Sequence, residues 1–506
     1  MLPTRTRRHA LALCLLAWSS ACTSSRTPPA PPASRAPALE ASAPGALDAV
    51  VRGKVRVAGS LATGRVRGRL AVAWATAEEA RALSSGKADF HLLADLFGRY
   101  RSAGEVELGA GAEAPYQLAV PAGDVVVFAL LDVAGQFARS LIKGDVAGNL
   151  TGQSLSPVRL ARGGTAEHDV ELTAAQRARG GPDPCTGERF QRVELDEPAL
   201  AGRVRNATTR RFCIYLPPSW RPGTTRRWPV AYLLPGLMSA ETARFGWPHA
   251  GRIADSLADE TGRELILVGV DTSSALGSTY LVDSPTTGAW ETFFTQRMVR
   301  ELDATLPTLA TSSARVLVGH STGGFNAMVM ALRHPEVFGA AVASSPDGLD
   351  LEAWMREPHT QQAIPLAVRW MRVEDELGGG GQFSSYGGDF SPDDSPRGFA
   401  WPIDLTTGTL VEPAWSRWMA HSPAVLLREE RVRAGARERL SGRILLMVGR
   451  QDEFGLHPPT ELFSHQLTRE GVAHELVVDE GGHHLGEVKL RAQLKWALGK
   501  LDAARE

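Results

Sequence analysis

The chain has almost no excess charge of either sign and no long hydrophobic run. It contains 55 Lys and Arg residues and 56 Asp and Glu residues, which gives a formal net charge of −1. This balance gives no electrostatic reason to expect a nucleic-acid partner. No apolar run is long enough to predict a membrane span in the mature protein. With 506 residues, the chain suits two or three domains.

Cysteine is also scarce, with four in the chain, and two of these fall in a targeting segment. Residues 1–22 combine a basic start with the short apolar core Ala10–Trp18, which predicts an export signal. The small residues before Cys22 resemble a bacterial lipoprotein cleavage box. We therefore expect a protein exported to the bacterial cell envelope and held to the membrane only by a lipid on Cys22. Plain cleavage, which would give a secreted protein, is the alternative.

After removal of this segment, Cys185 and Cys213 remain. One pair of cysteines in an oxidising compartment predicts a disulfide. The alternative is two buried thiols that never meet.

Residues 23–47 contain almost no large apolar side chains and are rich in Pro, Ala and Ser, which predicts a disordered linker. Residues 48–173 carry short β-like runs between glycines, such as Asp124–Val133. They predict a small all-β, sandwich-like accessory domain without a catalytic cluster. Carbohydrate binding by this domain is an open alternative.

From residue 185 to 506, strand-like and helix-like segments alternate, which is typical of an α/β sheet flanked by helices. Near-continuous apolar runs indicate strands buried on both faces. The expected strands are Phe212–Leu216, Pro229–Leu234, Leu265–Val270, Val316–Gly319, Gly339–Ser344, Ile444–Gly449 and Glu475–Val478. Expected helices are 290–306, 460–470 and the segment from 487 onward.

The sequence Gly319-His-Ser-Thr-Gly323 joins one of these strands to a helical pattern. It is a G-x-S-x-G nucleophile elbow, in which glycines allow the tight turn that exposes the serine. The pattern predicts Ser321 as a nucleophile. The amide of Thr322, at the helix N-terminus, would face any oxygen that becomes negative beside it.

A serine nucleophile needs a base, and the base needs an orienting acid. Asp452 follows the strand 444–449, and His483 follows the last strand and a pair of glycines. We expect these two to complete a Ser-His-Asp triad. Glu453 is an alternative acid. A metal site at His483 and His484 is disfavoured, because adjacent side chains diverge and no third ligand lies nearby.

A second amide is needed for an oxyanion hole. The strand 229–234 runs into Pro235 and Gly236, a tight turn that would present the amide of Leu237.

Residues 350–430 interrupt the α/β rhythm with four consecutive glycines and many aromatic residues. An insertion between strands often covers an active site, so we expect a substrate-facing cap. A structural excursion with its own core is the alternative. The nine aromatics are Trp354, Trp370, Phe383, Tyr386, Phe390, Phe399, Trp401, Trp415 and Trp418.

From about Arg210 to the C-terminus, the chain resembles the bacterial esterase family of α/β-hydrolases, which includes feruloyl esterases, enterochelin esterases and S-formylglutathione hydrolases. The matching motifs are Tyr232-Leu-Leu-Pro-Gly236, Gly319-His-Ser-Thr-Gly-Gly324, Asp452, Gly481-Gly-His483 and the segments around Asp283 and Gly288-Ala-Trp-Glu-Thr-Phe293. The resemblance implies an α/β-hydrolase fold. It also implies that Trp290 and Glu291 are structural residues near the site.

Together these observations predict an exported serine esterase that acts through an acyl-enzyme on a small-molecule or polysaccharide-linked ester. No metal or organic cofactor is expected. Two alternatives remain: an acyltransferase that uses the same triad on a sugar or lipid alcohol, and a non-catalytic surface binding protein with the same fold.

Overall fold

The computed structural model describes residues 47–502 except 62–63, 86–89, 178–182, 247–248, 357–362 and 379. The expected signal, Cys22 and nearly all of the linker lie outside the described residues. The chain forms two compact units. One runs to Gly180 and includes Asp375–Gly379, and the other comprises Gly181–Glu374 and Gly380–Glu506. No described helix combines the length and the apolar character needed to cross a bilayer.

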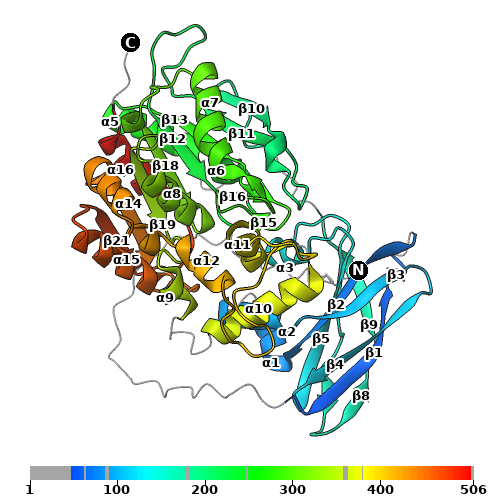
Figure 1. The fold of residues 1–506 in the computed structure, drawn as a ribbon. Coiled ribbons are helices and arrows are strands. Elements are labelled where there is room, and N and C mark those ends of the chain that lie inside the picture. The colour runs from blue at the N-terminus through cyan, green and yellow to red at the C-terminus, as the bar shows by residue number, and fades with distance from the viewer. Residues whose placement is uncertain are drawn as a thin grey trace, which may run out of the picture. The chain divides into compact units, whose positions relative to one another are not determined.

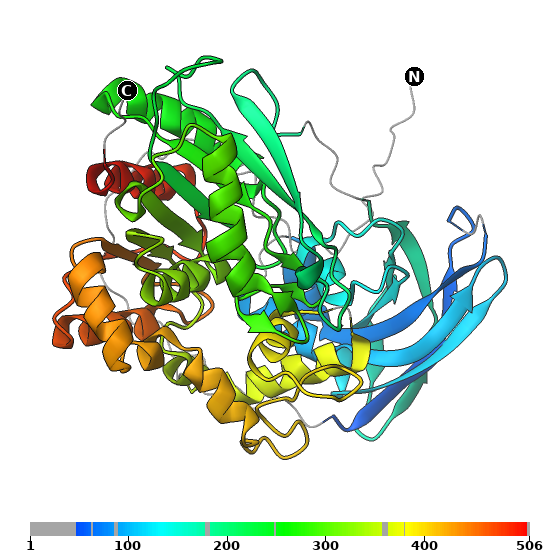
Figure 2. The ribbon, with the colours of Figure 1, turned by 45° about the horizontal axis from the view of Figure 1, so that its top comes forward.

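The first unit is β-rich (Figure 2). Its strands are β1 (Ala49–Val57), β2 (Val66–Thr76), β3 (Arg101–Leu108), β4 (Glu113–Val120), β5 (Gly123–Asp132), β6 (Leu150–Gln153), β7 (Val158–Leu160), β8 (Thr165–Glu167) and β9 (Val170–Ala175). The strand order is β3-β2-β5-β6-β9-β1-β4, with β7 on β5 and β8 on β1.

The sheet of this unit is rolled rather than flat. Strands β3 and β4 stand at the two ends of the order, yet only residues 109–112 connect them. A flat sheet of seven strands would separate its edge strands by about 29 Å, which four residues cannot span. Side chains from both ends, including Leu108 and Leu118, accordingly share one apolar core.

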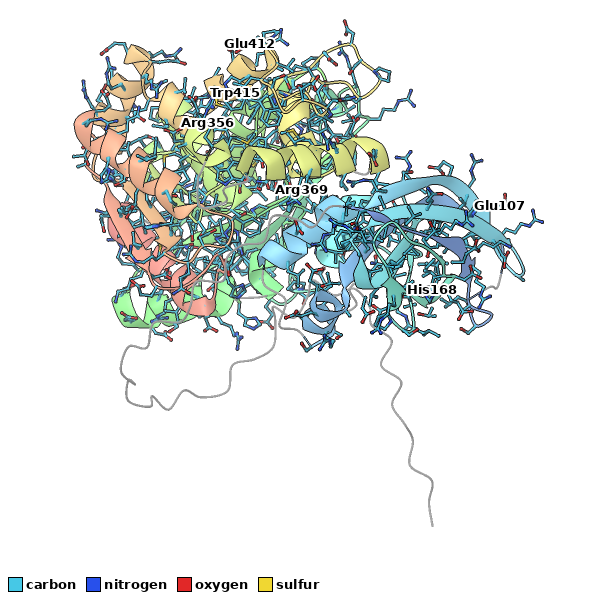
Figure 3. All side chains as sticks on the ribbon, turned by 90° about the horizontal axis from the view of Figure 1, so that it is seen from below. Glu107, His168, Arg356, Arg369, Glu412 and Trp415 are labelled. Carbon is cyan, nitrogen blue, oxygen red and sulfur yellow. A yellow bond between two sulfur atoms is a disulfide. The ribbon has the colours of Figure 1, made fainter. Side chains whose placement is uncertain are left out.

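Three helices in this unit were not predicted: α1 (Ala77–Ser84), α2 (Phe90–Arg99) and α3 (Phe137–Lys143). Helix α1 begins with a capping box, in which Thr76 and Glu79 exchange side-chain-to-backbone hydrogen bonds. Trp74 lies beneath the Arg99 guanidinium, 4.1 Å from the ring centroid. Glu107 and His168, labelled in Figure 3, belong to this unit.

The second unit has an eight-stranded sheet in the order β10-β11-β13-β12-β18-β19-β20-β21. β11 is antiparallel to both β10 and β13, and the remaining pairs are parallel. The strands are β10 (Phe190–Asp196), β11 (Thr209–Tyr215), β12 (Val230–Leu234), β13 (Ile266–Val270), β18 (Arg315–His320), β19 (Ala340–Ser344), β20 (Ile444–Gly449) and β21 (Glu475–Asp479).

Helices cover both faces of this sheet. Helices α7 and α8 lie on one face, and α5 and α16 on the other. The helices after residue 181 are α4 (Ala243–Gly246), α5 (Ala250–Thr261), α6 (Trp290–Thr292), α7 (Val299–Thr305), α8 (Thr322–Arg333), α9 (Leu351–Met355), α10 (Ala363–Leu377), α11 (Gln382–Phe390), α12 (Ala414–Ala420), α13 (Pro423–Leu426), α14 (Glu430–Gly435), α15 (His457–Arg469) and α16 (Glu487–Lys500). Two small hairpins precede α6: β14 (Ser273–Ser274) with β15 (Gly277–Ser278), and β16 (Asp283–Ser284) with β17 (Gly288–Ala289).

Strand β12 shows how the two faces are filled. Its residues 230, 232 and 234 join the core that includes α7 and α8, whereas 231 and 233 join the core that includes α5 and α16. This alternation follows from the two-residue period of a strand. Figure 1 shows α7 and α8 in front of the sheet.

A disulfide joins Cys185 to Cys213 on β11, with the two Cα atoms 5.7 Å apart. Cys213 is fully buried and Cys185 nearly so. The bond ties the segment that enters the second unit to the second strand of its sheet.

We expect loss of this disulfide to destabilise the second unit. The bond closes a loop of 28 residues, and restriction of the unfolded chain by a loop of that length corresponds to about 3 to 4 kcal/mol. Replacement of both cysteines by Ala should lower the free energy of unfolding by that amount in denaturant titrations. Unchanged unfolding, or two free thiols in the oxidised wild type, would contradict this prediction.

Candidate active site

The backbone at Ser321 has the strained geometry of a nucleophile elbow. With φ 59° and ψ −129°, Ser321 lies between β18 and α8 in a region that non-glycine residues rarely occupy. A Cβ on Gly319 would collide with the carbonyl of Gly323, and one on Gly323 would collide with the carbonyl of Leu234. The two motif glycines are therefore required by the close approach of strand, turn and helix.

The turn after β12 lies directly against Ser321. A Cβ on Gly236 would be 3.4 Å from the Ser321 Cβ. Met238 has a φ of 55°, and its amide donates to Ser278 Oγ at 2.9 Å, which fixes the end of the turn. Among the residues that the structure describes, the amides of Leu237 and Thr322 donate no hydrogen bond. Both N–H groups are thus available to a bound oxyanion.

His483 and Asp452 are brought together at the same edge of the sheet. His483 Nδ1 lies 3.0 Å from Asp452 Oδ2. The Asp452 side chain is fully buried, and the His483 side chain is 12% exposed. Because β20 and β21 are parallel neighbours, the loops after them emerge side by side. A bond at Nδ1 leaves Nε2 as the nitrogen that can accept a proton.

Glu453, the alternative acid, holds the backbone of this loop instead of the imidazole. Its Oε2 accepts a hydrogen bond from the His483 amide at 2.7 Å. A Cβ on Gly482 would collide with the Glu453 carboxylate. The glycine before His483 is therefore needed for close packing against Glu453.

Two rings flank the His483 imidazole. The ring centroids of His320 and Phe454 lie 4.7 Å and 4.5 Å from it. Burial, followed by the nearby charge of His483, lowers the pKa of His320 well below its usual value. His320 therefore packs against His483 as a neutral ring. His484 is exposed, and its pKa is lowered by partial desolvation and by the nearby charge of Lys489. No cluster suited to a metal ion occurs among the described residues.

Asp347 was not predicted from the sequence, although it follows β19 and reaches Ser321. Ser321 Oγ donates a 3.4 Å hydrogen bond to Asp347 Oδ1. No motif marks the residue. The one available signal was its place after a strand that neighbours β18, since carboxyl ends of parallel strands share an edge.

Most aromatic residues of the insertion at 350–430 belong to the hydrophobic core and do not form a surface for substrate. Seven of its nine aromatic side chains are buried, and Trp354 and Trp370 pack against the same apolar core. These residues are therefore core residues, but they join the main core of the second unit, whereas the alternative was an insertion with a core of its own. Trp354 is partly buried, and its indole N–H donates to the carbonyl of Phe454 at 2.9 Å. Figure 3 shows Trp415 beside Arg356, whose guanidinium lies 5.4 Å from the ring centroid.

Trp290 and Glu291 have structural roles, but Glu291 lies away from Ser321. Its carboxylate pairs with Arg333 at 2.7 Å and with His334 at 2.8 Å, at the C-terminal end of α8. Ser321 precedes the other end of that helix, about 18 Å away. Trp290 is buried, and its indole N–H donates to the Thr287 carbonyl at 2.8 Å.

The strand order and the elbow define an α/β-hydrolase, with the residues of a serine hydrolase at the carboxyl edge of its sheet. A family model described as "Putative esterase" matches residues 206–498, more than half of the chain, and the protein belongs to this Esterase family. It is therefore an esterase, a carboxylic ester hydrolase.

The chain is also similar to solved structures. A ferulic acid esterase is 18% identical, with a TM-score of 0.42, and the match covers 61% of this chain and 96% of that one. An S-formylglutathione hydrolase from Agrobacterium tumefaciens is 18% identical, with a TM-score of 0.41, over 62% and 95%. MPT51 from Mycobacterium tuberculosis is 14% identical, with a TM-score of 0.41, over 62% and 100%. A comparison with curated proteins gave no match.

Proposed function

We propose that the protein is an exported serine esterase that cleaves carboxylic esters through an acyl-enzyme, with Ser321, His483 and Asp452 as its triad. The observation that carries this proposal is the bond of 3.0 Å between His483 Nδ1 and Asp452 Oδ2, at the sheet edge where Ser321 stands on its strained elbow. Ser321, Asp452 and His483 are the residue types that acyl transfer requires, and they follow the chain order nucleophile, acid, histidine of the α/β-hydrolases.

The reaction follows from these positions. Ser321 Oγ attacks the ester carbonyl while His483 Nε2 takes the hydroxyl proton, and Asp452 stabilises the resulting imidazolium. The carbonyl oxygen becomes negative between the amides of Leu237 and Thr322, each worth on the order of 3 kcal/mol to the transition state. His483 then returns the proton to the leaving alcohol. Water, activated by His483, releases the acid from Ser321.

The substrate fits the class of small-molecule or polysaccharide-linked esters. The ring of Phe454 lies beside the His483 imidazole, with 4.5 Å between the ring centroids, and the indole N–H of Trp354 donates to the Phe454 carbonyl. An aromatic ring in this position can contact a planar or apolar part of an ester.

Labelling with a fluorophosphonate probe tests the assignment of Ser321. The wild type should be labelled and should release free acid from short-chain aryl esters, whereas Ser321→Ala should do neither. Transfer of the acyl group to an added sugar or lipid alcohol, with little free acid, would make the protein an acyltransferase. An unlabelled and inactive wild type would indicate a non-catalytic binding protein.

We also propose that the protein is exported and held at the cell envelope by a lipid on Cys22. The basic start, the short apolar core and the small residues before Cys22 support this. Cys22→Ser should convert a membrane-associated protein into one recovered in the soluble fraction. A wild type found soluble after export, with no acyl group on its N-terminus, would contradict the anchor.

A further inference from the structure

Asp347 is a buried carboxylate at the base of the nucleophile. It is 3% exposed, and its amide donates to the carbonyl of Ser321 at 3.2 Å. Its Oδ1 accepts the hydrogen bond from Ser321 Oγ. Its Oδ2 accepts two more, from Tyr280 Oη at 2.8 Å and from Thr322 Oγ1 at 2.9 Å. Three hydroxyl groups from two segments of the second unit, the elbow at 321–322 and the segment around Tyr280, therefore converge on one carboxyl group.

These contacts are suited to a negative charge. Burial is the largest influence and raises the pKa of Asp347 above its usual value, while the hydroxyl donors Tyr280, Thr322 and Ser321 and the nearby charge of His483 partly offset this rise. All three hydroxyl donors are neutral, and a positive charge on His483 lowers the pKa of Asp347. Because Asp347 accepts the hydroxyl of Ser321, it lies next to the nucleophile whose proton His483 would take. Coupling between two sites is reciprocal. A charged Asp347 therefore favours the protonated form of His483.

The insertion supports this arrangement through Tyr280. The ring of Tyr386, on α11, stacks on Tyr280 with centroids 4.1 Å apart and planes inclined by 17°. Both side chains are fully buried. In addition, the Asp389 carboxylate on α11 accepts a hydrogen bond from the Tyr280 amide. Two residues of the insertion thus fix the tyrosine that donates to Asp347.

We propose that Asp347 is a positioning residue that holds the Ser321 hydroxyl in the free enzyme and whose charge favours protonated His483 during catalysis. The proposal rests on the function proposed above. When Ser321 attacks the ester, its proton turns from Asp347 to His483 Nε2, so Asp347 neither gains nor loses a proton. The imidazolium is then stabilised by Asp452 directly and by Asp347 across the nucleophile.

The pH dependence of kcat/KM separates this role from a purely structural one. The acid limb of that profile reports the free enzyme's base, which must be neutral to act. The charged and titratable groups around His483 are Asp452, Glu453, His320, His484, Lys489 and Arg244. Asp347→Asn leaves all of them unchanged. Loss of the Asp347 charge removes a stabiliser of protonated His483. The acid limb should therefore move to lower pH by about 0.5 unit or more.

The same variant should slow the chemical step. We expect kcat of Asp347→Asn to fall about 10-fold or more, with KM within about twofold of wild type, because the lost stabilisation arises in the transition state. Circular dichroism and thermal unfolding would establish that the variant is folded.

Two further variants serve as comparisons. Glu374 is another buried carboxyl group, and it accepts the hydroxyl and amide of Ser384 away from Ser321. Glu374→Gln should leave the acid limb in place. Tyr280→Phe keeps the Asp347 charge but removes one of its donors, so kcat should fall about threefold or more while the acid limb stays in place.

Several results would overturn the proposal. The first is that the acid limb of the kcat/KM profile of Asp347→Asn lies at the same pH as in the wild type, or shifts no further than the acid limb of Glu374→Gln. The second is that the acid limb of Tyr280→Phe shifts to lower pH as far as the acid limb of Asp347→Asn does. If Asp347→Asn does not fold, an unchanged kcat in Tyr280→Phe would by itself overturn the proposal. Activity in Ser321→Ala would instead refute the proposed function, so the two failures are distinguishable.

Discussion

Replacement of His483 by Ala should lower kcat by about 10⁴-fold or more, as much as Ser321→Ala. His483 is the histidine whose Nδ1 contacts Asp452, at 3.0 Å, which orients the ring for proton transfer through Nε2. Without it, Ser321 has no base and the leaving alcohol no proton donor. Because the triad acts as a unit, Ser321→Ala combined with His483→Ala should be little worse than either single variant. Steady-state hydrolysis of an activated ester measures all three.

His484→Ala is the matched control, one residue along the same loop. His484 is exposed, and its pKa is lowered by partial desolvation. We expect this variant to keep most of the activity, with any loss traceable to loop position or stability. If His484→Ala were inactive and His483→Ala active, the base would be misplaced by one residue. Normal activity in both would refute the triad.

The sheet was predictable because its central strands are apolar on both faces. All seven predicted strands of the second unit occur, with ends shifted by a few residues at most. Strand β10 was missed because it lies at the edge, where its side chains are partly exposed and carry charges such as Arg192 and Glu194. Its sequence resembles a polar connection, and only its pairing with β11 makes it a strand.

The candidate site was predictable to the extent that backbone constraints appear as glycines. Gly319 and Gly323 mark the elbow because a Cβ at either position would collide with backbone. Gly482 marks the histidine loop in the same way, through the Glu453 side chain. Asp347 has no such mark. Its role depends on hydroxyl groups that converge only in the folded chain, and no spacing in the sequence reports that convergence.

The aromatic insertion shows the limit of composition as evidence. Aromatic residues beside glycines and prolines suit a binding surface and a core equally well. At Gly387 the structure distinguishes a core from a binding surface, because a Cβ at this position would collide with the ring of Phe399. The glycine in this instance permits tight packing inside the insertion instead of freedom for a mobile cap.

Asp452→Asn should lower kcat by roughly 10⁴-fold with the fold intact. The Asp452 side chain is fully buried, and its Oδ2 accepts from His483 Nδ1, while Oδ1 accepts from the Phe454 amide at 3.1 Å. An amide in its place can donate to Nδ1, which would favour the tautomer with a proton on Nε2. That tautomer cannot accept the Ser321 proton. The loss should therefore appear in kcat, with thermal unfolding close to that of wild type.

Glu453→Gln provides the comparison, since it removes the neighbouring charge without changing the shape of the side chain. Glu453 accepts the His483 amide at 2.7 Å, and a glutamine carbonyl oxygen can accept the same bond. We expect a loss of about 10-fold or less, because the backbone contact survives and the imidazole keeps its partner. A larger loss in Glu453→Gln than in Asp452→Asn would identify Glu453 as the acid. Equal, small losses in both would mean that the imidazole needs no carboxylate, and the contact at 3.0 Å would then be structural.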